Sequence, residues 1–204
     1  SVSDGQGGTD TATVTVNILA VSASSLSGNT VFRFRNADTG VHLYTTSELE
    51  ANNIRENLPN YTYEFSAFRS ADPANGPVSE VMRYLNSETG AHIFTSDPVE
   101  ISSFEQFPHI TLEQLAYNAY VDPVPGSIPV YRFRNEDTGA HFYTASEAEK
   151  QFLADFPQYV PEGNNGIAYY VDPGDPFPDF FEPPPGTAFT GLGGVSIEEE
   201  LFQI

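Results

Sequence analysis

Apolar and polar residues alternate in short stretches of this chain, and the first such stretch is followed by a tight-turn sequence. Residues 31–35 read Val-Phe-Arg-Phe-Arg, so two phenylalanines lie on one face of an extended chain and two arginines on the other. Residues 36–40 read Asn-Ala-Asp-Thr-Gly, and the glycine of such a turn can take a positive φ. Together with His-Leu-Tyr-Thr at 42–45, the pattern predicts a β-hairpin.

A short helix and a third strand are predicted after this hairpin. Ser47 precedes Glu50 by three residues, the spacing of a capping box in which each side chain bonds the other residue's backbone N–H. Apolar residues continue at helical spacing until Pro59, which stops the helix. Alternation then predicts third strands at 61–65, 115–121 and 167–171.

This unit of strand, turn, strand, helix and strand occurs three times. The motif Arg-x-x-Asn-x-Asp/Glu-Thr-Gly-x-His-x-Tyr/Phe-Thr starts at Arg33, Arg83 and Arg132. A unit of about 45 residues cannot bury both faces of its own sheet, so we expect three units to share one core. The sequence therefore predicts an α+β domain in which three strand-turn-strand-helix-strand repeats pack with pseudo-threefold symmetry.

The repeat also predicts the domain boundaries. The triple-repeat domain is expected at 29–173, with repeats at about 29–76, 78–126 and 128–173. Residues 1–20 are expected to be a linker or the last strand of a preceding β-sandwich, because a Gly- and Asp-rich turn leads into the alternating Thr/Val run at 11–18. Residues 174–204 are expected to form a Pro-rich C-terminal extension and linker.

The charge of the protein excludes two classes of partner. Acidic residues outnumber basic ones by 28 to 8, which gives a formal charge of −20 at pH 7. Eight cations cannot form the basic face of a nucleic-acid binder or the basic patch that anionic membranes attract. No stretch approaches the ~20 apolar residues of a membrane span, so membrane insertion is not expected either.

The sequence gives no positive case for an enzyme. The absence of cysteine excludes disulfides, cysteine nucleophiles and cysteine metal sites. No Gly-x-Ser-x-Gly nucleophile motif occurs, and no glycine-rich loop stands between a strand and a helix. Paired carboxylates stay open among 28 acids, but no spacing singles out a pair. We therefore predict a non-catalytic protein.

Residues that recur in every unit are expected to hold the fold, because an active site is needed only once. The recurring glutamates are assigned to helix capping and the recurring arginines to bonds with carboxylates or carbonyls where units meet. The recurring histidines have two open interpretations, structural hydrogen bonding or a three-imidazole metal site on the axis. These residues are Glu50, Glu100 and Glu149; Arg33, Arg83 and Arg132; and His42, His92 and His141.

Residues that differ between units are better candidates for binding. Arg35 and Arg134 correspond to Leu85 in the second unit, and Arg69 has no basic counterpart. An arginine that no neighbour uses can receive a carboxylate, although a local ion pair explains these residues equally well. The predicted ligand-binding residues are Arg35, Arg69, Arg134, Tyr120 and Tyr170.

Aspartates near the ends of the units are candidate calcium ligands. Asp-Pro closes each unit and is by itself an ordinary turn start, but the third copy adds two more aspartates downstream. Carboxylates and loop carbonyls are the hard oxygen ligands that suit Ca²⁺. The predicted metal ligands are Asp122, Asp172, Asp175 and Asp179.

Two parts of the sequence resemble known families. Asp-Gly-Gln-Gly-Gly-Thr-Asp-Thr-Ala-Thr-Val-Thr-Val at 4–16 resembles the final strand of the cadherin-like extender domains of large bacterial repeat-in-toxin (RTX) adhesins. The triple motif resembles a bacterial repeat family of largely unassigned function, seen in cell-surface and lysozyme-associated proteins. A module in this position resembles the calcium-dependent peptide-binding domain of such adhesins.

The resemblance implies a secreted, extracellular module of the bacterial surface that binds the C-terminal ends of partner or host proteins in adhesion, haemagglutination or biofilm formation. Ca²⁺ would offset part of the negative charge and bridge to a peptide carboxylate. We expect the fragment to be monomeric. Other interpretations stay open: a calcium-dependent carbohydrate-binding module in which exposed Tyr120, Tyr169 or Tyr170 stacks on sugars, an accessory domain of a cell-wall hydrolase, or a structural spacer.

Overall fold

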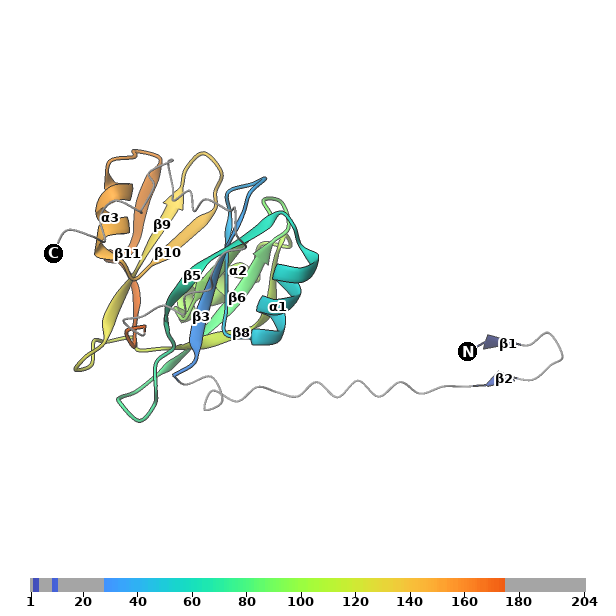
Figure 1. Ribbon diagram of the computed structural model, residues 1–204, viewed down its shortest axis with the longest axis horizontal. Coiled ribbons are helices and arrows are strands. Elements are labelled where there is room, and N and C mark those ends of the chain that lie inside the picture. Colours follow the sequence, from blue (N-terminus) through green and yellow to red (C-terminus); the bar gives the residue numbers. More distant parts are fainter. Residues whose placement is uncertain (1, 4–8, 11–27, 175–204) are drawn as a thin grey trace, which may run out of the picture.

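A computed structural model describes residues 2–3, 9–10 and 28–174 of the protein (Figure 1). The expected strand at 11–18 and nearly all of the expected extension at 174–204 lie outside the described residues. Near the N-terminus, β1 (Val2–Ser3) pairs antiparallel with β2 (Thr9–Asp10). The remaining described elements form three sheets of three strands, each with one short helix.

The elements repeat in the order strand, strand, helix, strand, and we call the three sets units 1, 2 and 3. Unit 1 consists of β3 (Thr30–Asn36), β4 (His42–Thr45), α1 (Glu48–Asn57) and β5 (Tyr61–Arg69). Unit 2 consists of β6 (Ser79–Asn86), β7 (Ala91–Thr95), α2 (Pro98–Phe104) and β8 (Ile110–Ala119). Unit 3 consists of β9 (Ile128–Asn135), β10 (His141–Thr144), α3 (Glu147–Ala154) and β11 (Tyr159–Val171).

Within each unit the first strand lies in the middle of an antiparallel sheet. The strand orders are β4-β3-β5, β7-β6-β8 and β10-β9-β11. The hairpin turns form as the sequence predicts: Gly40, Gly90 and Gly139 have φ values of 72°, 69° and 69°, a region that glycine adopts without strain. The residues that follow these turns, Val41, Ala91 and Ala140, pack together in one small apolar cluster. The three turns therefore meet at one end of the domain.

The predicted α+β class is wrong, because the described part of the protein is mostly β-structure. The helices contain only 10, 7 and 8 residues. The third strands, in contrast, contain 9, 10 and 13 residues and are longer than alternation suggested. Each of them changes register where it pairs with the first strand of its unit, and such bulges interrupt the alternation from which strand length was judged.

The main core is built by all three units. Its centre holds one valine from the first strand of each unit, with no exposed surface, and one aromatic residue from each second strand. The Tyr44 hydroxyl donates to the backbone carbonyl of Tyr143 at 2.6 Å, and the Tyr143 hydroxyl accepts from the Phe94 N–H at 2.9 Å. Hydrogen bonds therefore link these rings across units, while their apolar bodies fill the core. The residues are Val31, Val81 and Val130; and Tyr44, Phe94 and Tyr143.

Candidate functional site

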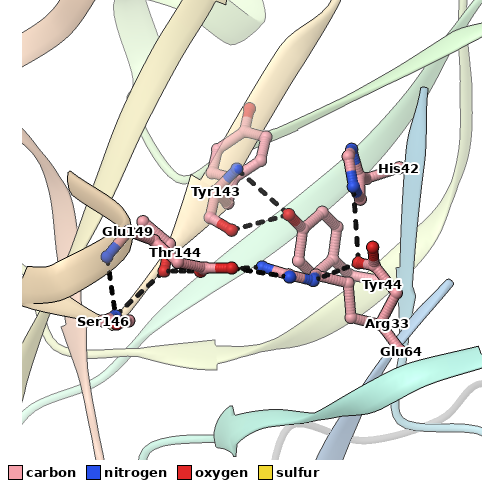
Figure 2. A network of polar contacts seen from close by, with 8 residues as sticks. All are labelled: Arg33, His42, Tyr44, Glu64, Tyr143, Thr144, Ser146 and Glu149. Atoms are coloured by element: carbon pink, nitrogen blue, oxygen red, sulfur yellow. Dashed lines mark hydrogen bonds and ion pairs between the residues drawn. The ribbon is translucent and has the colours of Figure 1, made fainter. Parts of the chain in front are cut away.

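The recurring arginine of unit 1 lies buried between two carboxylates at the contact with unit 3 (Figure 2). Arg33 is 1% exposed; its Nε lies 2.6 Å from Glu64 Oε2 in β5. Its Nη1 and Nη2 donate to the two oxygens of Glu149 in α3, at 3.0 and 2.8 Å. Thr144 also donates to Glu149. Such bidentate, charge-assisted contacts are among the stronger polar interactions in proteins.

The same contact occurs at the other two unit boundaries, and we call each one a joint. Arg83 of unit 2 donates to both oxygens of Glu50 in unit 1, at 3.0 and 2.8 Å. Arg132 of unit 3 donates to both oxygens of Glu100 in unit 2, at 2.8 and 2.6 Å. With Arg33 reaching from unit 1 to unit 3, the joints link every unit to both others. This confirms the prediction that the recurring arginines bond carboxylates where units meet.

The recurring glutamates do not complete capping boxes. The helix starts are as predicted, because Ser47 and Ser146 accept from the backbone N–H three residues later, and Asp97 accepts from Val99. The glutamate side chains, however, turn away from their own helices and hold the arginine of the next unit. The capping assignment of these side chains is therefore wrong, because an ion pair with a buried guanidinium is available to them.

The recurring histidines each face a glutamate of their own unit. Nε2 of His42 lies 3.4 Å from Glu64, that of His92 lies 3.3 Å from Glu113, and that of His141 lies 3.0 Å from Glu162. Among the described residues, no group of three or more histidine, aspartate, glutamate or cysteine side chains could hold a metal ion. The histidines therefore belong to the joints, as the structural interpretation proposed.

Burial and pairing act against each other at the joint of Arg33. Burial by itself would raise the pKa of Glu64, but the contact with His42 and the charge of Arg33 outweigh burial, so that this pKa is lowered. Burial lowers the pKa of His42, against the pull of Glu64. The ionised carboxylate and the neutral imidazole are thus the favoured forms at neutral pH. The glutamates of the third strands were missed at the sequence level, although Glu64, Glu113 and Glu162 recur at a constant spacing.

Arg35 stands apart from the other basic side chains. It lies next to the turn of unit 1 on β3, opposite His42, and it is half-buried. It forms no hydrogen bond or ion pair with any residue that the structure describes, whereas each of the other seven basic residues has such a partner. Its counterpart Arg134 pairs with Glu136 at 3.2 Å, and its counterpart in unit 2 is Leu85.

Four other predicted site residues lie together at the opposite end, where the third strands finish. Arg69 donates from Nε to the carbonyl of Gly28 and from its backbone N–H to the carbonyl of Asp172, at 2.8 and 3.1 Å. Tyr120 and Tyr170 form an isolated antiparallel bridge. The Tyr120 hydroxyl lies 3.1 and 3.2 Å from the carboxylate oxygens of Asp172. These contacts hold the beginning and the end of the triple-unit region side by side.

The geometry changes the roles expected for these residues. Tyr120 and Tyr169 are 0% and 1% exposed, so the expectation that they stack on sugars is wrong, while Tyr170 is half-buried. Asp172 already accepts from Tyr120 and from the Asp72 N–H at 2.9 Å. The described residues therefore show no preformed calcium site around it. Asp122 is exposed, and Asp175 and Asp179 lie outside the described residues.

Comparison with known proteins gives a family but no activity. A family model described as a domain of unknown function, DUF5648, matches residues 15–106 and again residues 80–177. Comparisons with curated proteins and with solved structures gave no match. None of the helices that the structure describes is long and apolar enough to span a membrane. Because the two family matches together span more than half of the sequence, the protein belongs to the DUF5648 family.

Proposed function

We propose that the domain is a non-catalytic adhesion module of a secreted bacterial surface protein that binds short peptides by their free C-terminal carboxylate. The observation that supports this most is Arg35. In a protein with a formal charge of −20, it is the one basic side chain without a hydrogen-bond or ion-pair partner among the described residues. A guanidinium presents two parallel N–H donors that match the two oxygens of a carboxylate.

The position of Arg35 also suits a receptor. It lies at the end of the domain where the three turns meet, and the flanking segments attach at the opposite end, near Gly28 and Asp172. Because Arg35 is half-buried, solvent screens its charge less than that of a fully exposed side chain. Each arginine of the joints is already paired with two carboxylates within the fold, so these cations do not compete for a ligand.

Calorimetric titration with short peptides tests this proposal. Each peptide is used with a free and with an amidated C-terminus, in calcium and in chelator. We expect heat only with the free carboxylate, and binding that strengthens in calcium because Ca²⁺ reduces the repulsion between the acidic protein and an anionic ligand. Equal binding of amidated and free peptides would contradict the carboxylate receptor, and binding of sugars in place of peptides would favour a carbohydrate-binding module.

A further inference from the structure

The third strand of unit 3 carries a bulge that the other units lack. Where β5 and β8 pair with the first strands of their units, single residues are skipped. In β11 the four residues between Glu162 and Ile167 have no partner in β9. Within this bulge Asn165 has a φ of 55°, the one positive φ among the described non-glycine residues, and Gly166 has a φ of 81°. Bulges leave residues unpaired and are common at sheet edges and next to functional sites.

Asn165 and Gly166 form an Asn-Gly pair that can react with itself. The backbone nitrogen of Gly166 attacks Cγ of Asn165, and the absence of a Cβ on glycine leaves this approach open. A new N–Cγ bond forms, the bond between Cγ and the amide nitrogen Nδ2 breaks, and the proton of the attacking nitrogen leaves with the amide group as ammonia. Water then opens the resulting succinimide at either carbonyl, which yields aspartate or isoaspartate.

The side chain of Asn165 is exposed, and its amide nitrogen lies 3.3 Å from Oδ1 of the neighbouring Asn164, which is also exposed. Gly166 itself is buried, and a Cβ there would lie 3.2 Å from the Pro161 side chain. The bulge takes no part in the pairing with β9, so the ladder does not fix the backbone of Gly166. Asn165 is thus held by few contacts.

A second Asn-Gly pair, formed by Asn75 and Gly76, is also exposed at its asparagine but is held by more contacts. Asn75 forms a side-chain hydrogen bond with the fully buried Tyr120, and its N–H donates to the Asp72 carbonyl at 2.9 Å. Gly76 packs so closely that a Cβ there would lie 2.6 Å from Val124 Cγ1. These contacts restrict both the amide and the backbone that would have to approach it.

We infer that Asn165 is a site of spontaneous conversion to aspartate and isoaspartate in the folded protein, while Asn75 is protected. This inference is independent of the proposed function. Conversion places a new carboxylate three residues after Glu162, which pairs with Arg132 at 2.9 Å and with His141 at 3.0 Å. Isoaspartate also adds a carbon atom to the backbone of β11. We therefore expect conversion to weaken the joint of Arg132 and to lower the stability of the domain as the protein ages.

Peptide mapping by mass spectrometry of the full-length protein, incubated at neutral pH, tests this inference. We expect the mass increase of amide hydrolysis, and isoaspartate, to accumulate in the peptide with Asn165 before the peptide with Asn75. In urea both pairs should convert at similar rates, because the difference comes from the fold. Asn165→Asp keeps a residue type that tolerates a positive φ but has no side-chain amide, so the mass increase of its peptide should disappear, which would exclude Asn164 as its source.

Two results would overturn the inference. One is conversion of Asn75 as fast as, or faster than, that of Asn165 in the folded protein. The other is a folded protein in which neither residue converts, although both do so in urea. The expected loss of stability is measured by thermal unfolding of fresh and aged protein. An unfolding midpoint that falls as the isoaspartate content rises supports a weakened joint of Arg132, and an unchanged midpoint refutes it.

Discussion

Replacing Arg33 by methionine tests whether the joints hold the units together. The substitution keeps most of the side-chain volume but removes the cation, so that Glu64 and Glu149, with 15% and 22% of their side chains exposed, face each other without compensation. Removing one partner of a buried ion pair typically costs about 3–5 kcal/mol, because the remaining charge is left buried and unpaired. Against the roughly 5–15 kcal/mol of a typical domain, this is a large fraction of the stability.

Equilibrium unfolding in urea, followed by tyrosine fluorescence, measures this cost. At about 2–4 °C per kcal/mol for a domain of this size, the thermal midpoint should also fall by about 6–20 °C. Arg134→Met is the matched control, since it removes an arginine whose pair with Glu136 is exposed, with 43% and 48% of the side chains accessible. Exposed pairs contribute about 0–1 kcal/mol, so the control should unfold almost like the wild-type protein.

The cost of Arg33→Met should also depend on pH. In the wild-type protein the pKa of Glu64 is lowered, so this carboxylate stabilises the fold above its unfolded pKa, about 4.5, and that contribution is lost as the pH falls. In the variant, protonation of Glu64 relieves the repulsion. The difference between the proteins should therefore be largest at neutral pH and shrink below about pH 4.5. A loss under about 1 kcal/mol, equal to that of the control, would refute the structural role of the joint.

Two further predictions concern the pH dependence of the wild-type protein. The stability of the fold should fall on acidification in two steps. Below pH 6.5 the unfolded chain binds a proton at His42 more readily than the folded protein, because burial lowers the pKa of His42 in the fold; below about 4.5 the same holds for the joint glutamates whose pKa is lowered. Urea midpoints between pH 7 and 4 measure this loss, and a flat profile would contradict it. Stability should also fall above pH 10. Burial raises the pKa of Tyr143 to about 12 and raises those of Tyr117 and Tyr169 well above 10.0, so the unfolded chain loses these protons first. Core tyrosines whose tyrosinate absorbance appears only with unfolding would support this, and ionisation of all eleven tyrosines at pH 10 in the folded state would refute it. The five glutamates are Glu50, Glu64, Glu100, Glu113 and Glu162.

The local features of the fold could be predicted from the sequence because they depend on neighbouring residues. The hairpin turns and the helix starts at Ser47 and Ser146 follow from short-range patterns repeated three times. The bonding of Arg33 across a unit boundary was predicted only from its recurrence in every unit, without its partner. The class was misjudged because a capping signal gives the start of a helix but not its length, and because bulges hid the length of the third strands.

The partners of polar side chains could be predicted only in part. Glu50 meets the geometric rule of a capping box, yet a buried guanidinium of another unit offers a stronger interaction, and no local rule shows that guanidinium to be near. Tyr120 carries a hydroxyl that suits a surface, but the structure buries it against Asp172. The divergence of Arg35 from Leu85 was visible in the sequence, whereas its lack of a described partner required the structure.

In the function we propose, the repeated charges hold the fold, whereas Arg35, which no described residue neutralises, receives the ligand. Calorimetry of Arg35→Leu beside Arg134→Leu tests these two roles together, because Leu85 shows that this register accepts leucine. We expect Arg35→Leu to fold with unchanged stability and lose binding to peptides with a free C-terminus, and Arg134→Leu to retain it. Full binding by Arg35→Leu, or equal losses in both variants, would show that Arg35 is not the ligand receptor.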